Sequence, residues 1–423
     1  MTTPALSPRA LATSVIRRVL LDDAFAAAAL TAELDRHVQL SSRDRAAVTD
    51  LVYGALRAAR YLDGRLSRLR PGLSLDPPLR ALFWVAGYEL TFRPMAPPPV
   101  VVSDAVEICK SIQRSASGLV NALLRRLLDD LTTSPAPPLP EAFVTGTPRW
   151  LRRALDRSLG SGEAERFLAA GPLPPPLCLR VRQGKRASWM ERLQAENPSA
   201  TFKESPLVSS AIRCFGGGDP RRWSGVREGA LVLQEEGSQL IGQCLEVRPG
   251  EIILDACAGR GNKTFLIADA LGGSGRVDAA DLHGTKLERL RTEAERLGIK
   301  LGDTFEIDAS VGRGAIRTAA YDRLLIDAPC SGVGTLRRRP EILLRRTESS
   351  LGELQTLQRT IVRNLAPAVK PGGTLLYAVC SVLREECEEV IENLEGFALE
   401  ELWRLLPHRE GCDGYAIARL RAL

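Results

Sequence analysis

Apolar residues recur every three or four positions along the front of the chain, which is the spacing of amphipathic helices. This spacing predicts helices over residues 10–34, 43–69, 79–92 and 101–128. The proline-rich stretches at 93–100 and 132–143 cannot continue a helix, so we expect breaks there. Residues 1–135 are therefore predicted to form an all-α domain.

The pattern changes twice further along the chain. Residues 150–170 again have helical spacing, and the stretch from Cys178 to Phe215 predicts strands around a helix, which together indicate a small α+β module over 144–228. From about Gly229 strand-like runs alternate with helical ones, and the strands are expected at 251–258, 275–282, 304–310, 321–330 and 372–380. Such alternation favours a parallel, doubly wound α/β domain over 229–423.

Composition narrows the class of protein. The 423 residues are 44% hydrophobic and 26% charged, which fits several globular domains and excludes global disorder. Nine scattered cysteines without a CxxC pair fit neither a disulfide framework nor a zinc ribbon, and with three histidines we expect no metal site. Neither a membrane-length apolar run nor a secretory signal is found, so a cytoplasmic protein without membrane partners is expected, and a monomer.

Charge is divided unevenly along the chain. The net charge is +6, with the positive excess in residues 1–230 and an acidic remainder. This favours a polyanion partner for the front part, although Arg-rich helices are most often solvated faces. The basic run RRRPEILLRR, Arg337–Arg346, either holds a nucleic-acid strand or is a solvated helix start.

In a doubly wound sheet, ligands bind beyond the carboxyl ends of the strands. The first such end carries DACAGRGNKT, Asp255–Thr264, whose glycines allow close backbone approach and whose Asn262 can cap the next helix. Asp281 follows the second strand, where a carboxylate commonly binds ribose hydroxyls. Asp308 and Asp327 end the next two strands; these carboxylates repel a pyrophosphate but suit the cationic S-adenosylmethionine. A simple turn is the alternative for Asp308.

Two thiols lie at this same edge, Cys330 in DAPCSG and Cys380 in YAVCS. A thiolate that adds to C6 of a pyrimidine makes C5 nucleophilic enough to take a methyl group, and it leaves once a base removes the C5 proton. Asp327 is placed to hold or protonate N3 of the ring. The residues themselves leave open which cysteine attacks.

The motifs DAPCSGVG and YAVCSVLREECEEVI, with LVLQEEGSQL before DACA and GLVNALLRRL in the front part, resemble a known family. It is the Nol1/Nop2/Sun type of RNA cytosine-5 methyltransferases, in particular the bacterial B-type branch that acts on small-subunit (16S) ribosomal RNA. The resemblance implies a multidomain fold: a NusB-like helical RNA-binding domain, a small α+β RNA-binding module and a Rossmann-like methyltransferase domain.

The resemblance also implies roles for single residues. Cys380 would be the nucleophile, Cys330 would assist release of the methylated base, and Lys263 would lie near the active site with Asp327. Cofactor contacts would come from Cys257, Ala258, Gly259, Arg260, Gly261, Asn262, Lys263, Asp281, Asp308 and Asp327. The loop departs from the family pattern, which has proline at Arg260 and glycine at Asn262.

We therefore expect an S-adenosylmethionine-dependent methyltransferase acting on C5 of a cytosine in 16S ribosomal RNA. One alternative is the same chemistry on another RNA, such as transfer RNA. A second alternative, from a different class, is a non-catalytic RNA-binding or ribosome-assembly protein whose altered loop no longer holds the methyl donor.

Overall fold

The computed structural model describes residues 7–93 and 96–423, and its chain divides into two compact units. The helical unit comprises residues 1–153, 161–174 and 336–345, and the sheet unit comprises 154–160, 175–335 and 346–423. Part of the break expected at 93–100 falls on residues 94–95, which lie outside the described residues. Within the described ranges, no helix is long and apolar enough to cross a membrane.

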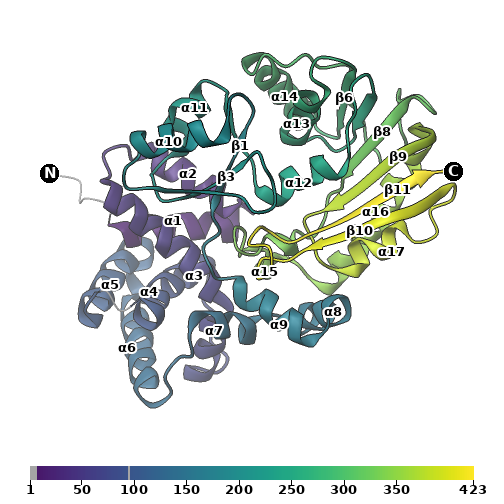
Figure 1. The fold of residues 1–423 in the computed structure, drawn as a ribbon. Helices are drawn as coiled ribbons and strands as arrows, with labels where there is room; N and C mark the ends of the chain where they lie inside the picture. The colour runs from purple at the N-terminus through teal and green to yellow at the C-terminus, as the bar shows by residue number, and fades with distance from the viewer. Residues whose placement is uncertain (1–6, 94–95) are drawn as a thin grey trace. The chain divides into compact units, whose positions relative to one another are not determined.

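The described residues of the helical unit form helices and no strand (Figure 1). Side chains that precede two of them accept hydrogen bonds from the first turn: Ser41 from Asp44 N at 3.1 Å and Asp76 from Leu79 N at 3.0 Å. The core is apolar and includes the fully buried Trp84. The helices are α1 (Pro8–Leu21), α2 (Ala26–Arg36), α3 (Ser42–Leu69), α4 (Pro77–Phe92), α5 (Pro98–Gln113), α6 (Ser117–Thr133), α7 (Leu139–Gly146), α9 (Ser161–Ala170) and α15 (Ile342–Arg345), while α8 (Arg149–Leu159) has residues in both units.

Two of the four helices predicted within residues 1–135 are each broken in the structure, and the helical stretch predicted over 150–170 is divided at Gly160 into α8 and α9. The one expected over 10–34 is interrupted between α1 and α2, where Asp23 has a φ of 49° that no α-helix accommodates. The one expected over 101–128 is split by the 3₁₀ turn Arg114–Ala116 between α5 and α6. The apolar spacing continued across both breaks because the helices on either side pack into the same core.

A four-stranded antiparallel sheet opens the sheet unit, in the order β2-β3-β1-β4. Leu179 and Ile212 of this sheet share an apolar core with Trp223, which precedes α11. The elements are β1 (Leu177–Val181), α10 (Arg186–Glu196), β2 (Thr201–Glu204), β3 (Ala211–Phe215), α11 (Ser224–Arg227) and β4 (Leu231–Leu233). Strands around a helix were expected here, and the boundaries 144–228 stay a prediction.

The larger sheet has seven strands in the order β10-β11-β9-β8-β5-β6-β7. Strands β5 to β9 are parallel, which confirms the doubly wound fold class, and β11 and β10 form an antiparallel edge visible in Figure 1. The elements are α12 (Glu236–Cys244), β5 (Ile252–Asp255), α13 (Asn262–Leu271), β6 (Arg276–Asp281), α14 (Gly284–Arg296), β7 (Thr304–Glu306), β8 (Tyr321–Asp327), α16 (Glu348–Leu365), β9 (Val369–Val379), α17 (Glu388–Ile391), β10 (Phe397–Leu405) and β11 (Tyr415–Ala422).

The order of this sheet reverses at β5, which has β6 on one side and β8 on the other. In open α/β sheets, such a reversal opens a crevice outside the carboxyl ends of the strands. Asp255, Asp281 and Asp327 are the last residues of β5, β6 and β8, and Cys380 directly follows β9. The fold thus brings the expected site residues to one edge.

The basic run after Cys330 lies in the helical unit up to Arg345, and Arg346 belongs to the sheet unit. Arg337 is buried and donates to the carbonyls of Leu173 and Pro174, at 3.3 and 3.2 Å. Arg345 donates to the carbonyls of Val19 and Ala24, at 3.0 and 2.6 Å. The guanidinium groups of these two side chains thus bind carbonyl oxygens of the protein itself, and an RNA contact of this run stays a prediction.

Candidate active site

The loop after β5 turns sharply at its glycines. Gly259 and Gly261 have φ values of 58° and 90°, a region that side chains rarely adopt. Gly261 is itself the residue that precedes α13, so Asn262 is the first helical residue and not the cap that we expected. A Cβ at Gly261 would lie 2.6 Å from the Phe265 ring and 2.8 Å from Leu290. The loop therefore depends on glycine for both conformation and space.

Asp281 holds this loop from the neighbouring strand. Its carboxylate accepts from Gly259 N at 2.9 Å and from His283 N at 2.9 Å, and it pairs with Lys286 at 3.3 Å. The structure thereby brings together two parts of the expected cofactor site, the glycine loop and Asp281. Arg260, which replaces a proline of the family pattern, is exposed to solvent. Its charge is therefore hydrated rather than enclosed in the loop.

Asp255 is a buried carboxylate that the sequence did not single out as a site residue. Thr264 Oγ1 donates to its Oδ2 at 2.7 Å, while its buried Oδ1 has no hydrogen-bond partner among the described residues. Burial raises the pKa of Asp255 to about 6, although the Thr264 hydrogen bond and the charge of Lys263 oppose this shift.

Lys263 forms an ion pair with Asp327, with Nζ 2.6 Å from Oδ2. Burial lowers the pKa of Lys263, but the carboxylates of Asp327 and Asp255 and the thiol of Cys380 outweigh it, so the pKa is raised overall. Lys263 therefore stays charged. Because Cys380 is among the groups that raise this pKa, the ammonium group lies close enough to the expected nucleophile to interact with it electrostatically.

The two expected thiols lie together. Cys330 Sγ and Cys380 Sγ are 3.3 Å apart, and both side chains are half-buried. The hydrogen bond with Cys380 and then burial raise the pKa of Cys330 well above its usual value. Burial also raises the pKa of the Cys257 thiol, near the start of the loop, so that residue stays protonated. Cys330 and Cys380 are thus in direct contact, and Cys257 is a neutral thiol.

The backbone on either side of the thiols is closely packed. Gly334 N donates to Cys380 O at 3.0 Å, and Gly414 N donates to Gly334 O at 2.8 Å. A Cβ at Gly334 would lie 1.9 Å from the Gly414 carbonyl oxygen. Only glycine fits at this crossing, which ties the chain after Cys330 to the chain at Cys380.

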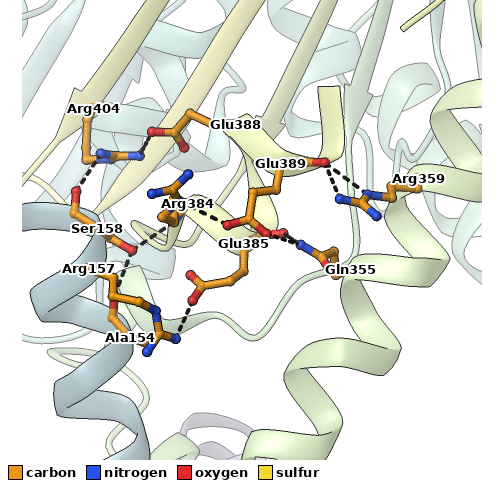
Figure 2. A network of polar contacts seen from close by, with 10 residues as sticks. All are labelled: Ala154, Arg157, Ser158, Gln355, Arg359, Arg384, Glu385, Glu388, Glu389 and Arg404. Carbon is orange, nitrogen blue, oxygen red and sulfur yellow. Dashed lines mark hydrogen bonds and ion pairs between the residues drawn. The ribbon is translucent and has the colours of Figure 1, made fainter. Parts of the chain in front are cut away.

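The segment after Cys380 is held by a network of polar contacts (Figure 2). Arg157 Nη2 donates to Glu385 Oε1 at 2.6 Å, and the Ser158 hydroxyl accepts from Arg384 N at 2.9 Å. From the other side, Gln355 Nε2 of α16 donates to the Glu385 carbonyl at 2.8 Å. Residues far apart in sequence therefore fix this segment.

Asp308 is the one expected carboxylate that the structure leaves apart from this cluster. It lies in an exposed turn after β7, and its Oδ1 accepts from Ser310 N at 2.9 Å and from Ser310 Oγ at 2.5 Å. These hydrogen bonds lower the pKa of Asp308. A simple turn, the alternative expected for Asp308, accounts for these contacts. A cofactor role for Asp308 stays a prediction.

The donor set fits S-adenosylmethionine. Asp255, Asp281 and Asp327 supply carboxylates at the edge of the sheet, and the nearby cations Lys263 and Lys286 are each already paired with one of them. A cationic sulfonium and amine therefore meet a compensating negative charge. Within the described residues, no group of three or more His, Cys, Asp or Glu side chains is arranged to hold a metal ion.

Comparison with known proteins adds independent findings. The family model described as 16S rRNA methyltransferase RsmB/F matches residues 242–421, and the NusB family model matches residues 6–129. Ribosomal RNA small subunit methyltransferase B of Pseudomonas syringae pv. tomato is 33% identical over 402 residues, which cover 92% of this chain and 86% of that protein. Probable ribosomal RNA small subunit methyltransferase B of Synechocystis sp. is 30% identical, with 98% of this chain and 99% of that protein covered.

A solved structure is similar over nearly the whole chain. The crystal structure of PH0851 matches with a TM-score of 0.82 and 24% identity, covering 98% of this chain and 99% of that one. At this level of identity the likeness shows a shared fold.

Proposed function

The chain belongs to the RsmB/F family of S-adenosylmethionine-dependent 16S rRNA methyltransferases, and we propose that it methylates C5 of a cytosine in small-subunit ribosomal RNA through Cys380. The observation that carries this proposal is the pair of thiols 3.3 Å apart, near the Lys263–Asp327 ion pair. An RNA-binding scaffold has no use for such a pair of thiols, because neither thiol contributes to binding phosphates.

Cys380 is the nucleophile in this proposal. Its thiolate adds to C6 of a cytosine that has left its stack, so that a sulfur–carbon bond forms and C5 becomes nucleophilic. Asp327 holds or protonates N3 as charge develops on the ring. Lys263 keeps Asp327 in place through their 2.6 Å contact.

Cys330 assists the release of the methylated base. Loss of the C5 proton to a base returns electrons to the ring, the bond between Cys380 and C6 breaks, and the thiolate is expelled. Cys330 lies next to that sulfur, and its raised pKa keeps it a neutral thiol before the reaction begins.

S-adenosylmethionine supplies an electrophilic methyl group when it is bound. The residues proposed to hold it are those of the loop Cys257–Lys263, together with Asp281, Asp308 and Asp327. Among these, Gly259 and Asp281 are already joined by a 2.9 Å hydrogen bond, which keeps the loop backbone close to the carboxylate.

A methylation assay with two RNAs tests this function. The protein is incubated with labelled S-adenosylmethionine and either 16S ribosomal RNA or transfer RNA, and bisulfite mapping locates the modified cytosine. We expect label in the ribosomal RNA. Label in transfer RNA alone would point to another substrate, and label in neither would leave a non-catalytic RNA-binding protein.

The helical unit is proposed to bind the RNA. Positive charge is concentrated in residues 1–230, and Arg125 and Arg126 on α6 are exposed. Deletion of residues 1–135 is a poor test, since Arg345 and Glu341 have their hydrogen-bond partners there. The double variant R125E/R126E should instead weaken RNA binding several-fold and lower its salt dependence. Unchanged RNA affinity would contradict the assignment.

We also propose that the protein acts in the cytoplasm, where its proposed substrate ribosomal RNA is found, and that it acts as a monomer. Light scattering at the concentration of the assay measures the mass in solution, and a dimeric mass would contradict this.

A further inference from the structure

Glu386 is a fully buried carboxylate that connects the segments carrying the two thiols. It lies in the 3₁₀ turn Arg384–Glu386, shortly after Cys380. Ser331, which directly follows Cys330, donates to it twice, from its N at 2.7 Å and from its Oγ at 2.5 Å. The carboxylate is thus bound to the backbone immediately beside Cys330.

Gln358 of α16 extends this link to the other side of Cys330. Its Nε2 donates to Glu386 Oε1 at 3.1 Å and to the Pro329 carbonyl at 2.9 Å. Pro329 and Ser331 flank Cys330, so both neighbours of the thiol are held through one carboxylate and one amide. Arg346 Nη2 also donates to the Cys330 carbonyl at 3.3 Å.

The turn that carries Glu386 is also bonded to β9, the strand that directly precedes Cys380. Tyr377 of β9 donates through its hydroxyl to the Glu386 carbonyl at 2.8 Å. The contacts of Figure 2 hold the residues on the same turn, Arg384 and Glu385. Glu386 therefore has a fixed backbone from which its side chain reaches the loop of Cys330.

We propose that Glu386 is a positioning residue that keeps Cys330 beside Cys380, so that Cys330 can act when the methylated base is released. Three hydrogens point at its oxygens, from Ser331 N, Ser331 Oγ and Gln358 Nε2, which is the pattern that an acceptor-only carboxylate satisfies. The role in release rests on the proposed function, whereas the role in placing the thiols does not.

The first test measures the placement of the thiols without RNA or S-adenosylmethionine. Diamide oxidises two nearby thiols to a disulfide: both S–H bonds break, the S–S bond forms, and the diazene of diamide takes up both hydrogens. In Glu386→Gln an amide faces the Ser331 donors, so we expect the Cys330–Cys380 disulfide to form at least fivefold more slowly, as followed by mass spectrometry of peptides. A rate equal to that of the unaltered protein would overturn the proposal.

The matched control is Glu385→Gln, which changes the neighbouring carboxylate and breaks its contact with Arg157 while leaving the Ser331 bonds in place. Its rate of disulfide formation should be unchanged. Should Glu386→Gln fail to fold, Ser331→Ala replaces it. This variant removes the hydroxyl bond to Glu386, together with the 3.3 Å bond that the hydroxyl accepts from Val333 N, and keeps the bond from Ser331 N. We expect at least a twofold slower reaction, and an unchanged rate contradicts the proposal.

The second test measures release. With RNA and S-adenosylmethionine, the covalent protein–RNA adduct should live at least tenfold longer in Glu386→Gln, as seen on denaturing gels. In a Cys330→Ala background the same substitution should add nothing, because its effect passes through Cys330. A further lengthening in that background would overturn the proposal. If the unaltered protein forms no adduct at all, the proposed function fails, while the diamide result still decides the placement of the thiols.

Discussion

The two sides of the site are held by different means. On the proposed cofactor side, the loop 257–263 turns at two glycines with positive φ, and Asp281, which bonds the loop, belongs to a partly exposed charged pair with Lys286. On the thiol side, Glu386 and Gln358 are buried and bond several groups at once. The proposed cofactor side thus depends on a few contacts, whereas the side with the two thiols is held by several buried hydrogen bonds at once.

Substitution of the nucleophile should give the largest effect on activity. It also shows most clearly whether the cofactor side and the thiol side act independently. In Cys380→Ala the covalent step is lost, so methyl transfer should fall at least ~1000-fold, as measured by label incorporated into 16S ribosomal RNA. The affinity for S-adenosylmethionine, measured by calorimetry, should stay the same because the loop is untouched. A large loss of cofactor affinity would show that the two sides are not independent.

Substitution of the second thiol should stop the reaction later. Cys330→Ala should still form the bond between Cys380 and C6 but release the base slowly, so that a protein–RNA adduct accumulates on denaturing gels. The opposite pattern, with an adduct in Cys380→Ala and none in Cys330→Ala, would exchange the two roles.

Lys263 lies between the two sides, and its loss should affect both. Lys263→Met leaves Asp327 without its cation and removes an opposing charge from buried Asp255, so the free energy of unfolding should fall by about 2–3 kcal/mol. Urea denaturation measures this change, and methyl transfer should also fall. Lys286→Met, which removes a more exposed partner of Asp281, is the control and should cost less than about 1 kcal/mol.

A side chain at Gly261 should damage only the cofactor side. Gly261→Ala places a Cβ against Phe265 at a φ of 90°, so we expect a loss of about 1–3 kcal/mol in stability and weaker binding of S-adenosylmethionine. The diamide reaction of the two thiols should keep its rate. A slower reaction would mean that the loop also places the cysteines.

The smallest expected effect is a dependence of stability on pH from Asp255. Its pKa of about 6 in the folded protein lies above the ordinary value, so the folded state binds the proton more tightly, and stability is lost as the pH rises from about 4 through 6. Asp255→Asn removes this penalty. The free energy of unfolding of the variant, relative to that of the unaltered protein, should rise by about 1–3 kcal/mol from pH 4 to pH 8 in urea titrations. A difference that does not vary with pH would contradict the raised pKa of Asp255.

Much of the fold followed from local patterns. The alternation from Gly229 onward predicted the five parallel strands, because a buried strand and its covering helix each leave a periodic signature. The sequence resemblance and the NusB-like front part were confirmed by the family models. The breaks inside the helices predicted over 10–34 and 101–128 were missed because apolar spacing shows which face is buried and not whether the backbone is continuous.

The site was predicted less completely, since it depends on contacts between distant segments. Asp327, Lys263, Cys330 and Cys380 do lie together, but Glu386 was missed within the acidic run REECEEV, which is typical of a solvated helix. One signal was present: Leu383, Cys387 and Val390 surround Glu386 at helical spacing, which places it on the apolar side. Its partner Ser331 is not local, so no spacing rule identifies the pair.

The segment Leu336–Arg345 has a consequence for how the protein is made. It belongs to the helical unit, where Glu341 accepts a hydrogen bond from Ala26 N at the start of α2 and Leu344 packs against the apolar core. Synthesis on the ribosome produces the N-terminal helices long before this piece exists. Part of the surface of the nascent helices therefore stays uncovered while β1 to β8 are translated. Chaperones that shield exposed apolar surface have their longest opportunity to act during that interval.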